Sequence, residues 1–239
     1  MSNKTISLNL GITKVFPCAY LENQTEQLIL LIDPQDNAQH YYPTLLANGF
    51  RRSGEQVYRP NCEHCQACQS LRINTFNFNK SRSQKRLLNK NSAFTTKISP
   101  HLRPCYYALY QRYITRIHPD GPMFPASKRQ YEEFITSTWS KSIFIEIYDR
   151  EKLIAVSVTD LLSAEKSKAW SALYCFYDPD YRSHSLGKFA VLCQLQLALA
   201  HQVEWLYLGY YVKNSQKMNY KSQFRPHQRF IDRHWIDFN

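Results

Sequence analysis

The sequence predicts a mixed α+β fold in which helices flank a sheet, and three observations lead to this prediction. Residues 143–148, 153–161 and 169–177 are successive apolar and aromatic runs with short polar connections, as in an antiparallel meander. Residues 185–203 are apolar on most faces, which indicates a buried helix. A strand-like run, EWLYLGYY at 204–211, follows that helix directly. A chain of 239 residues that is 44% hydrophobic is long enough to bury such a core.

The segments before the meander predict a smaller α/β part that packs against this sheet. Residues 1–17 are predicted to form an arm or an edge, and residues 26–32 a buried strand that ends in the turn at Asp33-Pro34. Helical character begins past Pro43 and stops at Gly49, a suitable helix C-cap. The remaining predicted elements are strands at 56–59 and 70–78, helices at 106–117 and 128–139, and a basic loop at 212–229.

The charge of the chain points to a polyanionic partner. Thirty Lys and Arg stand against 19 Asp and Glu, for a net charge of +11 and an isoelectric point near 9.3, so nucleic acid is the first candidate. Residues 78–104 contain no acidic residue but include Lys80, Arg82, Lys85 and Arg86, which indicates either a solvated linker or a track for phosphates. We place the domain boundary in this region, with one domain at 1–98 and the second at 99–239.

The cysteines allow more than one interpretation. The N-terminus lacks the order of a secretory signal and no apolar run is long enough to cross a bilayer, so we expect a reducing cytoplasm. There, clustered thiols indicate metal binding or catalysis more often than disulfides. Cys62, Cys65 and Cys68, with Cys18 as a fourth ligand, suit Zn²⁺ or an iron–sulfur cluster, and the alternative is reduced thiols in a substrate-binding loop. Metal analysis of anaerobically purified protein distinguishes these alternatives.

The order of the predicted elements indicates a particular kind of α+β fold. Two helices, a meander, a buried helix and a further strand are the order of the acetyltransferase-like (GNAT) fold. In acetyl-CoA enzymes of this fold, a glycine-rich turn before the buried helix binds pyrophosphate through backbone amides. Ser185 stands where the first glycine of this turn is expected, which weakens the prediction of an acyl-CoA donor and favours another acyl donor.

Motifs along nearly the whole chain resemble those of one enzyme family. They are PCAYL, GFRRSG, YRPNCEHCQAC, SRSQKR, HPDGPM, CFYDPDYRSHSLG, YLGYYV and KMNYKSQFRP. They resemble the bacterial aspartate/glutamate leucyltransferases, relatives of the eukaryotic arginyl-tRNA–protein transferases. The resemblance implies transfer of an amino acid from aminoacyl-tRNA to proteins with N-terminal Asp or Glu, which marks them for proteolysis by the N-degron pathway. It implies leucine as the donor, with arginine as the alternative, and no cofactor for the transfer itself.

The chemistry of such a transfer needs positioning more than a strong base. An aminoacyl ester is already activated, and an α-amine with a pKa of about 7.7 to 8.0 is partly neutral in the cytoplasm. The enzyme must align the amine with the ester, stabilise the oxyanion and protonate the leaving ribose oxygen. The candidates for this work are Tyr174, Asp178, Tyr210, Tyr211, Lys217, Tyr220 and Lys221. The alternative for the tyrosines is a place in the core or at its rim.

An acidic acceptor calls for arginine, which binds carboxylates bidentately. The predicted substrate-binding residues are Arg51, Arg52, Tyr58, Arg59 and Arg72, with Arg82, Lys85 and Arg86 for tRNA. If Arg51 and Arg52 lie on a strand, one of them must point away from the substrate. Two other functions explain part of these features: a non-enzymatic nucleic-acid-binding module with a zinc knuckle, and an acyl-CoA-dependent N-acetyltransferase.

Overall fold

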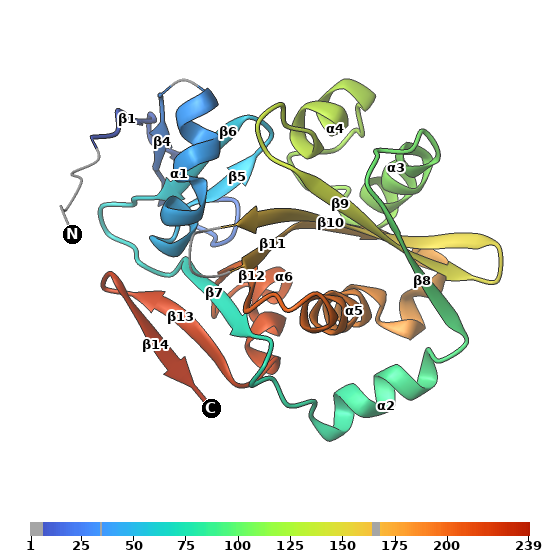
Figure 1. The fold of residues 1–239 in the computed structure, drawn as a ribbon. Coiled ribbons are helices and arrows are strands. Elements are labelled where there is room, and N and C mark those ends of the chain that lie inside the picture. The colour runs from blue at the N-terminus through green and yellow to red at the C-terminus, as the bar shows by residue number, and fades with distance from the viewer. Residues whose placement is uncertain (1–6, 34, 164–167) are drawn as a thin grey trace.

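The computed structural model describes residues 7–33, 35–163 and 168–239 and shows the predicted mixed α+β architecture (Figure 1). Residues 1–6 of the predicted arm and Pro34 of the predicted turn lie outside the described residues. Two sheets dominate the molecule, one of four strands and one of eight, and a short two-stranded ladder accompanies them. Within the described ranges, no helix combines the length and apolar character needed to cross a membrane.

The eight-stranded sheet contains the predicted meander. Its strand order is β14-β13-β7-β12-β11-β10-β9-β8. The strands are β7 (Gln69–Asn74), β8 (Phe94–Ser99), β9 (Ser142–Asp149), β10 (Lys152–Ser163), β11 (Lys168–Tyr177), β12 (Trp205–Tyr211), β13 (His227–Ile231) and β14 (His234–Phe238). Strands β9, β10 and β11 pair antiparallel, as the alternation of their residues predicts. Strand β12 pairs with β11 in parallel, because the intervening helix returns the chain to the same end of the sheet.

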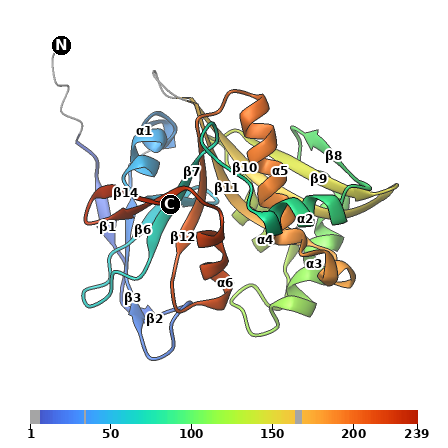
Figure 2. The ribbon, with the colours of Figure 1, turned by 90° about the horizontal axis from the view of Figure 1, so that it is seen from below.

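Helices cover both faces of this sheet (Figures 1 and 2). On one face, α5 (Leu186–Ala200) packs its buried apolar residues against β7, β9 and β12, and Leu87 and Leu88 of α2 (Arg82–Lys90) pack beside it. On the other face, α3 (Cys105–Ile117) and α4 (Lys128–Ile135) form an aromatic cluster with β9, β10 and β11. Helix α4 ends before the predicted residue 139, since Thr136 takes an extended conformation.

The smaller sheet belongs to the N-terminal part. Its strand order is β1-β4-β6-β5, from β1 (Leu10–Ile12), β4 (Leu28–Leu31), β5 (Arg51–Ser53) and β6 (Gln56–Pro60). The ladder pairs β2 (Phe16–Pro17) with β3 (Thr25–Glu26). Helix α1 (Gln35–Ala47) begins earlier than predicted and contains Pro43. Its Tyr42, Leu45 and Leu46 share a core with Leu162 and Tyr207 of the large sheet.

Strand β7 lies before the predicted domain boundary and β8 spans it, and both are hydrogen-bonded into the eight-stranded sheet, β7 beside β12 and β8 beside β9. The N-terminal part therefore supplies strands to both sheets. The division at residues 98 and 99 stays a prediction.

Two features of the large sheet shape the site. Only three residues of each strand pair between β11 and β12: Ala169–Ser171 of β11 lies beside Trp205–Tyr207 of β12. Beyond these residues the two strands separate. The predicted loop at 212–229 is instead structured: it holds α6 (Gln216–Asn219), a 3₁₀ turn at Tyr220–Gln223 and the start of β13, which pairs with β7 and β14. The largely polar sequence of β13 does not indicate a strand, although β13 is paired on both sides and β14 is the strand at the rim of the sheet.

Candidate active site

A cavity of about 1430 Å³ lies where the separated ends of β11 and β12 face the smaller sheet, α3 and α6. Most of the predicted site residues line it. They are Arg51, Arg52, Tyr58, Arg59, Tyr174, Tyr210, Lys217, Tyr220 and Lys221, together with Cys18, Cys62, Cys65 and Cys68. Asp178, Tyr211, Arg72, Arg82, Lys85 and Arg86 are not part of its lining. Residues predicted from distant parts of the sequence thus meet around one space.

Arg51 occupies the gap between β11 and β12. Its side chain reaches from β5, is only 4% exposed, and donates from Nη2 to the backbone oxygen of Ala172 at 2.6 Å. Gly209 has a φ of +80°, and a Cβ there would lie 3.5 Å from Nη2, so the guanidinium packs directly on the β12 backbone. Nη1 is buried and has no hydrogen-bond partner within the described part of the chain. A buried donor of this kind is suited to a ligand oxygen.

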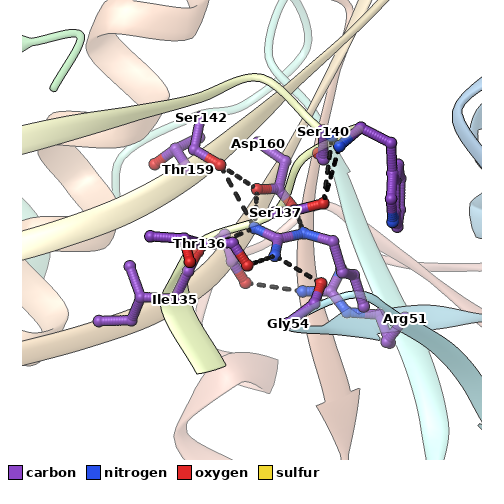
Figure 3. Close-up of polar contacts among 12 residues, drawn as sticks. Arg51, Gly54, Ile135, Thr136, Ser137, Ser140, Ser142, Thr159 and Asp160 are labelled. Carbon is purple, nitrogen blue, oxygen red and sulfur yellow. Dashed lines mark hydrogen bonds and ion pairs between the residues drawn. The ribbon is translucent and has the colours of Figure 1, made fainter. Parts of the chain in front are cut away.

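Arg52 points the other way, as alternation along a strand requires. Its guanidinium is fully buried and binds Asp160 of β10 twice, from Nε at 3.0 Å and from Nη2 at 2.5 Å. It also donates to the backbone oxygen of Gly54 at 2.9 Å. Ser142 donates to the same carboxylate of Asp160 at 2.7 Å (Figure 3). These contacts use all three nitrogens of the guanidinium, so Arg52 joins the two sheets. The prediction that Arg52 binds substrate is therefore corrected.

Lys221 is an uncommon buried lysine at the edge of the cavity. The 3₁₀ turn after α6 carries it inward, and it is 7% exposed. Its Nζ donates to the backbone oxygen of Tyr210 at 2.7 Å and contacts the sulfur of Met218 at 3.5 Å. Burial, and then the charge of Arg51, lower the pKa of Lys221 to about 7. An amine with this pKa can accept or donate a proton near neutral pH.

The cavity tyrosines are neutral phenols. Burial raises the pKa of Tyr58, Tyr174 and Tyr220, and burial also raises that of Tyr210, although the charge of Arg51 opposes the shift there. The Tyr210 hydroxyl donates to the backbone oxygen of Gly49 at 2.9 Å, which ties β12 to the smaller sheet. Buried phenols of this kind serve as hydrogen-bond donors and not as bases.

Asp178 and Tyr211, both predicted to be catalytic, lie outside the cavity. Asp178 forms ion pairs with Arg112 at 3.0 Å and Lys152 at 2.9 Å. Burial raises its pKa, but the hydrogen bond from Lys152 and the other polar contacts outweigh burial and lower the pKa overall. The ring of Tyr211 lies 4.1 Å from the guanidinium carbon of Arg229. These contacts assign both residues to the structure of the strand ends.

Arg72 and the basic residues of α2 also lie elsewhere. The Arg72 guanidinium is held between the rings of Trp205 at 3.9 Å and Trp235 at 4.1 Å and donates to Gln228 at 2.8 Å, so it packs within the sheet and is not part of the cavity lining. The side chains of Arg82, Lys85 and Arg86 are exposed on α2. Ser81 and Gln84 cap this helix through a capping box, which orders the basic segment on the surface.

The four clustered cysteines line the end of the cavity beside the β6–β7 connection. Burial, and then the nearby thiols of Cys18, Cys62 and Cys65, raise the pKa of Cys68 to about 12. The described residues hold no group of three His, Cys, Asp or Glu side chains arranged to bind a metal ion. The arrangement of these thiols thus does not match a preformed metal site, and metal binding stays a prediction from which we derive no reaction step.

Several lining residues were missed by the sequence analysis. Arg182 and Lys188 flank the start of α5, and Ser185 there adopts a φ of +49°, a left-handed conformation that glycine favours. Ser185 thus adopts backbone angles that glycine adopts more readily. Arg233 lies in the turn between β13 and β14, near enough to Arg59 to lower the pKa of Arg59 together with burial. Only the motif around Ser185 could have indicated any of them.

Comparisons with known proteins point to one family. Sequence models described as arginine-tRNA-protein transferase, N terminus and C terminus, match residues 16–86 and 105–231. The chain is 44% identical over 236 residues to an aspartate/glutamate leucyltransferase of Vibrio cholerae, covering 98% of this chain and 99% of that protein. It is 42% identical over 228 residues to the enzyme of the same name from Pseudoalteromonas atlantica, covering 95% and 96% of the two chains. The structure of L-PGS from Bacillus licheniformis matches with a TM-score of 0.42 and 9% identity, over 74% of this chain and 52% of that one.

Proposed function

Since this chain belongs to the family of the aspartate/glutamate leucyltransferases and arginine-tRNA-protein transferases and is an aminoacyltransferase, we propose that it transfers leucine from Leu-tRNA to the α-amine of N-terminal Asp or Glu. The observation that carries the proposal is the guanidinium of Arg51, a residue that lines the cavity and whose buried Nη1 has no hydrogen-bond partner among the described residues. The reaction belongs in the cytoplasm, where aminoacyl-tRNA is available. Its product would be a substrate of the N-degron proteolytic machinery.

Arg51 is the proposed reader of the acidic acceptor. A carboxylate that accepts from Nη1 would satisfy the donor that the protein leaves open, whereas an apolar N-terminal side chain would leave it buried and unpaired. Arg59 and Arg233 line the same cavity and add positive charge. This arrangement favours Asp and Glu over neutral N-termini by charge and by hydrogen bonding.

Lys221 is the proposed proton carrier. In its neutral form, Nζ accepts a proton from the acceptor amine as that amine bonds to the ester carbonyl carbon. The tetrahedral intermediate then breaks its bond to the ribose oxygen, and the protonated Nζ returns the proton to that oxygen. The new peptide bond and the free 3′ hydroxyl balance the step. The positive charge of Lys221 and the phenols of Tyr174 and Tyr220 stabilise the oxyanion that forms in between.

Replacing Lys221 with methionine is expected to lower kcat at saturating Leu-tRNA by about a hundredfold to ten-thousandfold, the usual contribution of a positioned acid–base group. The Lys221 pKa of about 7 means that wild-type activity rises with pH through two ionisations, that of Lys221 and that of the acceptor amine, and levels off once both amines are neutral. The pH profile of the variant's activity should show only the ionisation of the acceptor amine. Lysine ¹³Cε NMR provides the direct check, because the resonance that titrates near pH 7 should be missing from K221M. A Lys221 resonance that titrates near its ordinary pKa would contradict the assignment.

The proposed tRNA contacts lie at two places. Arg182, just before α5, and Lys188, in its first turn, suit a phosphate near the 3′ end, because helix N-termini attract anions. The exposed side chains of Arg82, Lys85 and Arg86 suit phosphates farther along the acceptor arm. A triple substitution of these three residues by Gln should lower the slope of log K for tRNA binding against log salt by the amount expected for about three phosphate contacts. The rate of the transfer step in single turnover should stay unchanged. An unchanged salt slope would remove α2 from the interface.

A peptide transfer assay tests the function as a whole. The enzyme is incubated with Leu-tRNA or Arg-tRNA that carries a labelled amino acid, and with peptides that begin with Asp, Glu or Ala. Label from Leu-tRNA on the acidic peptides alone supports the proposal. An Nα-acetylated Asp peptide is the matched control, because it keeps the carboxylate but lacks the nucleophile. Label on the Ala peptide at the same rate, or transfer of an acetyl group from acetyl-CoA, would overturn it.

A further inference from the structure

One wall of the cavity is apolar and comes from elements far apart in sequence. Ile114 and Ile117 belong to α3, Met123 to the loop after it, Phe134 to α4 and Leu173 to β11, and all five line the cavity. They belong to a single apolar cluster, in which Ile114 is buried and the other four are partly exposed. The ring of Phe134 meets Tyr174 edge-on, with centroids 5.2 Å apart, so the wall adjoins the proposed reaction centre.

Charge around this wall is positive. The described residues that line the cavity include two carboxylates, Glu26 and Asp232. Glu26 lies at the cysteine end, where it raises the pKa of Cys68, and Asp232 lies in the turn between β13 and β14. Lys217 approaches the apolar wall instead, because its charge adds to burial in lowering the pKa of His118, the residue after Ile117 in sequence. None of the five residues of this wall carries a carboxylate that could pair with a cationic side chain.

We propose that this wall, formed by Ile114, Ile117, Met123, Phe134 and Leu173, binds the side chain of the transferred amino acid and selects leucine over arginine. The inference rests on the proposed function and adds the residues that select the donor. A branched aliphatic side chain is removed from water against five apolar neighbours. An arginyl side chain would lose its hydration without gaining a partner. An apolar pocket discriminates about 10- to 200-fold between substrates that differ by a single methylene, and exclusion of a charged side chain adds to this preference.

Introducing a carboxylate into the wall should change the donor preference. In Ile117→Asp and Met123→Asp, the ratio of kcat/KM for Leu-tRNA over Arg-tRNA should fall by roughly a hundredfold, through loss of apolar contact and gain of a partner for the guanidinium. The matched controls are Ile117→Asn and Met123→Asn, because asparagine has nearly the same size as aspartate but carries no charge. They should lower leucine transfer but leave arginine transfer at its wild-type rate. Asp and Asn variants that lower both donors in the same proportion would overturn the proposal.

Binding to the wild-type protein avoids any effect of substitution on folding. The probes are 3′-amino-3′-deoxyadenosine acylated on its 3′ nitrogen with leucine or with arginine. They mimic the aminoacylated tRNA end, and their amide bond cannot be used for transfer. We expect the leucyl compound to bind at least tenfold more tightly, and equal affinity would overturn the proposal. If the wild type fails to label Asp peptides from Leu-tRNA, the proposed function fails. If it labels them while the two probes bind equally, only this inference fails.

Discussion

Replacing Arg51 with lysine is expected to lower kcat/KM for transfer to Asp peptides by about a hundredfold or more. Lysine keeps the charge but lacks the fork in which Nη2 holds Ala172 and Nη1 remains as a second, unpaired donor. Truncating one partner of a buried, hydrogen-bonded charge pair costs about 2 to 5 kcal/mol, which corresponds to this range of rates. Labelled Leu-tRNA with Asp and Ala peptides measures the effect, and the Asp preference should fall along with the rate.

Two controls separate recognition from collapse of the site. Binding of Leu-tRNA to Arg51→Lys should stay near the wild-type value, because the proposed phosphate contacts lie at α5 and α2. Thermal unfolding shows whether the variant is folded. If Arg51→Lys transfers leucine to Asp peptides at the normal rate while its tRNA binding is lost, Arg51 binds the donor and the assignment is wrong.

Replacing Arg52 with methionine is expected to destabilise the protein by about 3 to 5 kcal/mol, since the buried carboxylate of Asp160 would lose its partner. At about 2 to 4 °C per kcal/mol for a chain of this size, the Tm should fall by roughly 10 °C. The double variant Arg52→Met with Asp160→Leu removes both charges and should recover part of this loss. Differential scanning calorimetry of the three proteins provides the measurement.

An exposed ion pair provides the matched control. Arg129 and Glu133 lie on α4 at the i,i+4 spacing with an N–O distance of 2.7 Å, and both side chains face solvent. Arg129→Met should cost only about 0.5 kcal/mol or less, because exposed pairs contribute little. If Arg52→Met and Arg129→Met shift the Tm equally, the buried pair does not join the two sheets as described.

Much of the large sheet could be predicted from local sequence. Alternating apolar residues identify β9, β10 and β11, and the continuous apolar character of residues 185–203 identifies α5, because burial requires these patterns. Cys62, Cys65 and Cys68 do lie between β6 and β7, as the flanking strands indicate. Strand β13 was not predicted because its residues are largely polar and pair with β14 and with Leu71 and Arg72 of β7, partners that local sequence does not reveal.

The sequence by itself determined the family motifs, the excess of positive charge and the set of arginines, tyrosines and lysines from which the site is built. Only the tertiary structure decided which of them face the cavity. Alternation along β5 requires Arg51 and Arg52 to diverge, but Asp160, from β10, decides which one becomes structural. The low pKa of Lys221 likewise arises from burial and from Arg51, 170 positions earlier in the chain. Burial and charge proximity depend on through-space distances, which sequence neighbours do not specify.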